Sequence, residues 1–126
     1  MPIQVNRKRF AEIVEKALAE LPEPFASHMD EMTVEIIDHP TDRQLKNAGL
    51  DDDELLMGLY EGVSMLDRNV EAPPTIPDKI FIFQEDHELV CDSEEQLEHE
   101  VRTTVLHEIG HHFGMDEEDL ERLGYR

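Results

Sequence analysis

The chain has 126 residues, of which 39% are hydrophobic, and this length and composition predict one domain, residues 1–126, around a single core. Its 6 glycines and 7 prolines are ordinary numbers that exclude a fibrous or disordered chain. Lys and Arg number 11 against 31 Asp and Glu, so the formal net charge is −20, which repels phosphate backbones and anionic lipids. We therefore expect neither nucleic acid nor a membrane surface as a partner.

The number of cysteines and the length of the apolar segments indicate the cellular compartment in which the protein is expected. Cys91 is the one cysteine, so no internal disulfide can form, and a reducing compartment is indicated. The charged residues near the amino terminus are not followed by the unbroken apolar stretch of a secretory signal. No run of about 18 apolar residues predicts a membrane span. We expect a cytoplasmic protein, and a monomer.

The first third of the chain predicts a helix followed by a strand. Residues 6–21 place apolar side chains three and four positions apart, which is the spacing of an amphipathic helix. Asn6 can cap this helix and Pro22 stops it. Residues 32–38 are rich in β-branched side chains and predict a strand.

The middle of the chain predicts a short helix and two strands. Thr41 lies three residues before Gln44, which is the spacing of a capping box, and predicts a helix over residues 41–48. Residues 55–62 form an apolar segment bounded by loop residues and predict a strand. Residues 79–84 carry the clearest strand signal in the chain.

The last third predicts a long helix and a short one. Three prolines within residues 69–77 indicate a surface loop, and residues 85–92 form a polar stretch without a predicted element. Ser93 can cap a helix of about twenty residues that ends where Gly114 can adopt a left-handed conformation. The apolar residues that recur along it every four positions are Leu97, Val101, Val105 and Ile109. Residues 117–123 predict a last helix, capped by Asp116. This order of elements predicts an α+β domain with a small sheet covered by helices.

The end of the long helix carries the chemistry. Its sequence His-Glu-Ile-Gly-His-His-Phe-Gly places His107 and His111 four residues apart, on one face and within reach of one Zn²⁺. Glu108 is rotated from His107 by about 100° around the helix. It is therefore too far round to be a third ligand, but it can reach a water on the metal and act as general base.

A zinc site needs a third protein ligand, and an acidic cluster follows the helix. In the extended pattern His-Glu-x-x-His-x-x-Gly-x-x-(His or Asp), the ligand comes three residues after the glycine, which here is Glu117. Asp116 is the second candidate, and Glu118 and Asp119 are interpreted as solvated or capping residues.

Three further side chains are candidates for a role beside the metal. His112 lies four residues after Glu108 and could orient its carboxylate, or be a partly exposed histidine. Tyr60 and Tyr125 could donate hydrogen bonds to an oxyanion, or simply pack as aromatic residues. Cys91 and the remaining histidines are interpreted as surface or structural residues. These histidines are His28, His39, His87 and His99.

At these residues the sequence resembles the minimal zincins, a family of small bacterial zincin-like metallopeptidases. The resemblance is strongest over residues 101–125 and extends to the Leu-Tyr-Glu-Gly segment of residues 59–62. It implies a zincin core without its second subdomain: a mixed sheet of about three to four strands, with the metal-binding helix packed on it near the C-terminus. It also implies His107 and His111 as ligands, Glu108 as the catalytic glutamate, and a third ligand after Gly114.

The sequence departs from the pattern of this family in its third ligand. Aspartate is the usual residue, whereas this chain has Glu117 at that position. The larger metzincins also have a methionine turn after the motif, but no methionine follows Met115.

Two functions follow as hypotheses. The first is a zinc-dependent peptidase that acts on a peptide or protein substrate, with the peptide added as a strand along residues 79–84 as one candidate sheet edge. The second is a zinc-binding or partner-binding domain without turnover, in which the metal stabilises a small chain.

Overall fold

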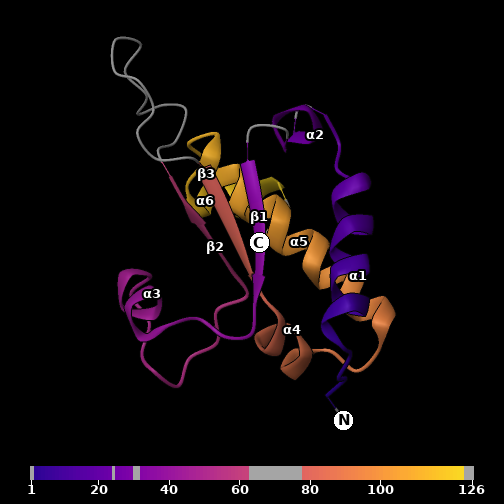
Figure 1. The fold of residues 1–126 in the computed structure, drawn as a ribbon. Coiled ribbons are helices and arrows are strands. Elements are labelled where there is room, and N and C mark those ends of the chain that lie inside the picture. The colour runs from indigo at the N-terminus through magenta and orange to yellow at the C-terminus, as the bar shows by residue number, and fades with distance from the viewer. Residues whose placement is uncertain (1, 24, 30–31, 63–77, 124–126) are drawn as a thin grey trace.

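The side-chain caps that the sequence predicts begin three helices in the computed structural model. The Asn6 side chain and Ser93 each accept a hydrogen bond from a backbone N–H in the first turn that follows, and Thr41 forms the predicted capping box with Gln44. The structure describes residues 2–23, 25–29, 32–62 and 78–123 (Figure 1). In chain order its elements are α1 (Arg7–Ala19), α2 (Phe25–His28), β1 (Met32–Ile37), α3 (Asp42–Asn47), β2 (Gly58–Glu61), β3 (Asp78–Phe83), α4 (Gln84–Val90), α5 (Glu94–His112) and α6 (Glu117–Leu123).

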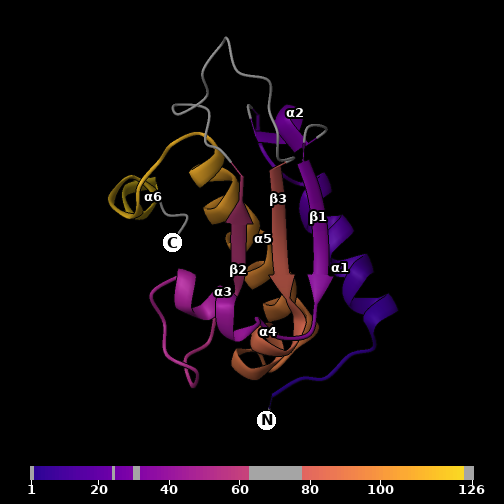
Figure 2. The ribbon, with the colours of Figure 1, turned by 60° about the vertical axis from the view of Figure 1, so that its left-hand side comes forward.

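The described strands form a mixed sheet in the order β1-β3-β2 (Figure 2). Strand β1 is parallel to β3, and β2 is antiparallel to it. The candidate edge at residues 79–84 is therefore wrong, because β3 is the central strand. The reason is visible in its composition: Ile80, Ile82 and Phe83 are fully buried, and the most apolar strand gains most by pairing on both sides. The predicted loop at residues 69–77 lies outside the described residues.

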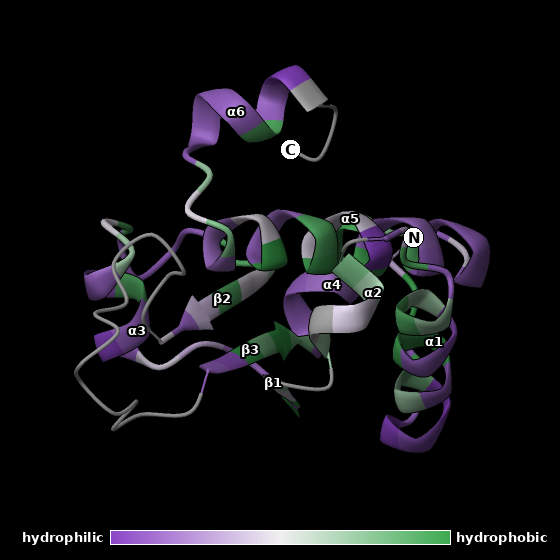
Figure 3. Cartoon of the chain, turned by 90° about the horizontal axis from the view of Figure 1, so that it is seen from above, coloured by the Kyte–Doolittle hydropathy of each residue, from purple (hydrophilic) through white to green (hydrophobic). Residues whose placement is uncertain are grey.

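The long helix α5 covers one face of this sheet and also packs against α1 (Figure 1). The four apolar residues predicted to recur along α5 all have an exposed fraction of 0%. They share one core with Phe10 of α1 and with Ile80 and Ile82 of β3. Figure 3 shows β3 and parts of α5 in the hydrophobic colour, whereas α6 is mostly hydrophilic. Within the described ranges, no helix combines the length and apolar character that crossing a bilayer requires.

Helix α4 occupies the polar stretch for which no element is predicted. Four of its polar side chains are buried and have polar partners, namely Gln84, Asp86, His87 and Glu88. Asp86 lies 2.7 Å from His39 Nδ1 and accepts a hydrogen bond from Leu56 N at 2.8 Å. His87 bridges Phe83 O and Thr104 Oγ1, and burial lowers the pKa of its imidazole. Apolar periodicity cannot reveal such a helix, because its contacts with the core are polar.

Strand β2 lies so close to α5 that only glycine fits at its first residue. A Cβ atom at Gly58 would meet Thr104 Cγ2 at 2.5 Å, Phe81 O at 3.0 Å and Glu108 Cγ at 3.4 Å. The backbone of β2 is thereby brought within hydrogen-bonding distance of the α5 side chains, which places the strand beside the histidine motif.

We expect Gly58→Ala to lower the free energy of unfolding by about 1–3 kcal/mol, because a methyl group is forced into a filled contact. The opposing gain from a stiffer unfolded chain is smaller, at most about 1 kcal/mol. Denaturant titration measures the change. Adding Thr104→Ser, which removes Cγ2 and keeps the hydroxyl, should recover part of the loss. A Gly58→Ala protein as stable as the parent would show that β2 and α5 are not in close contact.

Candidate metal centre

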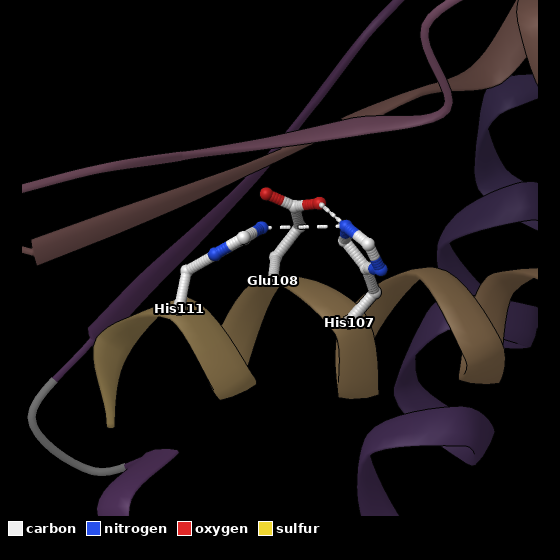
Figure 4. A group of neighbouring side chains, drawn as sticks. All are labelled: His107, Glu108 and His111. Carbon is white, nitrogen blue, oxygen red and sulfur yellow. Dashed lines mark hydrogen bonds and ion pairs between the residues drawn. The ribbon is translucent and has the colours of Figure 1, made fainter. Parts of the chain in front are cut away.

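The last two turns of α5 bring the imidazoles of His107 and His111 together on one face (Figure 4). Their Nε2 atoms are 3.3 Å apart, and the two side chains are 19% and 29% exposed. His111 Nδ1 lies 3.1 Å from Met115 O, and because a carbonyl only accepts, this nitrogen carries the proton. In the neutral imidazole the lone pair of His111 is then on Nε2, the atom that faces His107 and can bind a metal.

Glu117 completes a cluster of three donor atoms. Its Oε1 lies 3.2 Å from both Nε2 atoms. A tetrahedral zinc ion with ligands at about 2.1 Å holds its ligand atoms about 3.4 Å from one another. The three atoms therefore have the spacing of three ligands of such a site.

The turn between α5 and α6 explains why Glu117, rather than its neighbour, reaches the histidines. Gly114 has φ +80°, the left-handed conformation predicted for the end of α5, and it reverses the chain. Asp116 then caps α6, as predicted, because its Oδ1 accepts a hydrogen bond from Asp119 N at 2.9 Å. That hydrogen bond lowers the pKa of the Asp116 carboxyl. Its carboxylate is thus engaged in the cap, while Glu117 turns toward His107 and His111.

The Glu108 carboxylate lies between the two imidazoles on the side of the sheet (Figure 4). Its Oε1 accepts a hydrogen bond from Tyr60 N at 2.8 Å, and its Oε2 lies 3.7 Å from His107 Nε2. Burial raises the pKa of Glu108, and the two histidines and the Tyr60 N–H partly offset this rise. The carboxylate is therefore held where it can exchange a proton with a group beside His107.

A buried polar cluster lies behind the site and corrects two expectations. His112 is fully buried, with Nδ1 3.1 Å from Asp78 Oδ2, so it is not a partly exposed histidine, and its described charged partner is Asp78 rather than Glu108. The Tyr60 hydroxyl donates to Asp78 Oδ1 at 3.1 Å instead of facing the metal centre. No sequence signal marked Asp78, which is the first residue of β3. Tyr125 lies outside the described residues.

A cavity of about 310 Å³ opens beside His107, on the side toward the start of α5. Strand β2 and the segment before it form one wall, and α5 forms the other. The lining residues are Leu55, Leu56, Met57, Gly58, Glu100, Thr103, Thr104, His107 and Glu108. A molecule bound in this cavity would touch two residues of the motif.

Comparison with known proteins places this geometry in a family. No curated protein matches the chain significantly. A solved structure, described as a conserved hypothetical protein from Thermo thermophilus, is similar, with a TM-score of 0.55 over 94% of this chain and 97% of that one. The two sequences are 23% identical, so the likeness concerns the fold alone. The model of the zincin-like metallopeptidase family matches residues 29–125, which include the whole sheet and all of α5 and α6. The chain therefore belongs to the zincin-like metallopeptidase family, the family that its His-Glu-x-x-His helix resembles.

Proposed function

We propose that the protein is a zinc-dependent peptidase in which His107, His111 and Glu117 hold the metal and Glu108 is the general base. One observation carries the proposal: two Nε2 atoms and one carboxylate oxygen converge within 3.2–3.3 Å, beside a second carboxylate that is buried. The family match supports the reaction class, since the chain belongs to the zincin-like metallopeptidase family.

A bound zinc ion supplies Lewis acidity, which lowers the pKa of water and polarises a peptide carbonyl. The protein supplies the proton transfer: Glu108 accepts a proton from the attacking water at one carboxylate oxygen and returns it to the leaving amine. The Tyr60 N–H, 2.8 Å from Glu108 Oε1, holds the carboxylate in place during this transfer. The partly exposed histidines leave room for a peptide to approach.

The outer edge of β2 is the better candidate for binding an extended peptide. Met57 O accepts a hydrogen bond from Phe83 N of β3, whereas Tyr60 N donates to Glu108, away from β3. Because backbone groups alternate between the two sides of a strand, Gly58 also presents its backbone at this outer edge. The Tyr60 N–H stays with Glu108, so a peptide added there would pair with the backbone of Gly58 and pass by His107 and Glu108. This supports strand addition at β2 in place of β3.

The second candidate function is zinc binding without turnover. The metal would then tie the end of α5 to the start of α6, through Glu117, and so stabilise the turn at Gly114. The buried Glu108 favours catalysis over this alternative, because a purely structural site has no use for a carboxylate next to its ligands. We expect a peptide or protein substrate and a monomeric enzyme.

The third metal ligand can be tested by replacing Glu117 and its neighbour Asp116 one at a time. We expect Glu117→Ala to lose about 10-fold or more in zinc affinity, since a direct ligand should matter at least as much as the groups that orient ligands. Glu117→Asp restores the usual residue of the family and should retain the metal. Competition with a chromophoric chelator measures each affinity.

Asp116→Ala is the matched control for Glu117→Ala. It should retain zinc and lose only the cap of α6, at a cost of about 1 kcal/mol in unfolding free energy. The opposite pattern, with zinc lost from Asp116→Ala and kept by Glu117→Ala, would assign the third ligand to Asp116.

The general base can be tested without disturbing the metal. Glu108→Gln keeps the shape of the side chain and its hydrogen bond from Tyr60 N, but the amide cannot accept the proton. We expect zinc to stay bound and peptide hydrolysis to fall by about 100-fold or more. Cleavage of a peptide library, with and without a chelator, measures the activity. Undiminished hydrolysis by Glu108→Gln would contradict the assigned mechanism, and a parent protein that cleaves no peptide would favour the zinc-binding alternative.

A further inference from the structure

The cavity beside the metal centre combines apolar walls with one charged group. Its walls come from Leu55, Leu56 and Met57 before β2, and from the two threonines of α5, Thr103 and Thr104. The group at its far side is Glu100, which lies seven residues before His107 on the same helix. Seven residues of helix span about 10 Å, so Glu100 and the histidine motif lie at opposite ends of this space.

Glu100 is partly buried, and its side chain has no ion-pair partner among the residues that the structure describes. The described residues that line the cavity include neither lysine nor arginine, and Glu108 adds a second carboxylate at the other end. His87 is close enough for the charge of Glu100 to act on it, but burial has the larger effect and lowers the pKa of the His87 imidazole. Burial thus disfavours the protonated, cationic form of His87 that could pair with Glu100. Glu100 also borders a second cavity of about 450 Å³ with Val90 and Cys91, but that cavity does not reach the histidines of the motif.

We propose that this cavity binds a lysine or arginine side chain of the substrate, next to the bond to be cleaved, and that Glu100 selects it. The inference rests on the proposed peptidase function. The stem of a lysine is roughly 6 Å long from Cα to Nζ. It can lie along the apolar wall of Leu56 and Met57 while its ammonium group meets Glu100, as long cationic side chains do at apolar surfaces.

Other side chains fit this cavity less well. An acidic side chain would meet Glu100 and Glu108 in a protein whose formal net charge is −20. An apolar side chain of the same length would pack against the apolar walls. It would also remove water from Glu100 without giving the carboxylate a charged partner, which is unfavourable. A long cationic side chain packs its stem against the walls and pairs its charge with the carboxylate. Charge, rather than size, is therefore the basis of the expected selectivity.

The test uses fluorescein-labelled heptapeptide pools, randomised except for a central lysine, norleucine or glutamate. Binding is measured by anisotropy on zinc-loaded Glu108→Gln protein, so that the readout does not depend on turnover. We expect the lysine pool to bind about 5-fold or more tightly than the norleucine pool, which has a similar stem but no charge. Glu100→Gln in the same background should remove this difference, and Glu100→Lys should favour the glutamate pool.

Glu15→Gln is the matched control, because it removes the same charge from an exposed position on α1 and should leave the preference unchanged. Equal binding of lysine and norleucine pools, a preference that survives Glu100→Gln, or no binding of any pool would each overturn the proposal. Lysine-selective binding that depends on Glu100, in a parent protein that hydrolyses no peptide, would overturn the peptidase function and leave the cavity assignment standing.

Discussion

The close contact between strand β2 and helix α5 is the constraint on which the candidate site depends. Gly58 lets the strand approach until no Cβ would fit against Thr104 and Phe81 O. At that distance the backbone N–H of Tyr60 reaches the Glu108 carboxylate. A strand one side chain farther away would leave Glu108 buried without this hydrogen bond, and it would also change the cavity that the strand and the helix form between them.

Buried polar pairs hold the helices and strands around this contact. Asp78 accepts a hydrogen bond from the Tyr60 hydroxyl, and its Oδ2 lies 3.1 Å from His112 Nδ1. The first residue of β3 is therefore linked both to β2 and to the end of α5. At the other end of the sheet, His87 connects α4 to Thr104. Polar pairs of this kind require a definite geometry, because leaving either partner buried alone is costly. They fix the relative positions of elements that apolar packing alone would leave less well defined.

The candidate metal centre combines a rigid part with an adaptable part. His107 and His111 project from a regular helix whose other face is packed in the core, so their separation follows from helical geometry. Glu117 comes from the next helix, beyond the turn at Gly114, and its side chain is half exposed. Its carboxylate reaches both histidines from this turn, although glutamate is longer than the usual aspartate of the family. The acidic composition of the chain adds a general attraction for cations.

The sequence by itself determined the α+β class, the caps of α1, α3 and α5, the apolar face of α5 and the face shared by His107 and His111. These features depend on local hydrogen bonds and on helical periodicity, which are encoded within a few neighbouring residues. Only the tertiary structure decided that β3 is central, that the polar segment of α4 is a buried helix, and that His112 is paired with Asp78. Each of these depends on residues that lie far apart along the chain. Their pairing leaves no periodic pattern in the sequence, because the polar groups are buried by their partners and not by an apolar face.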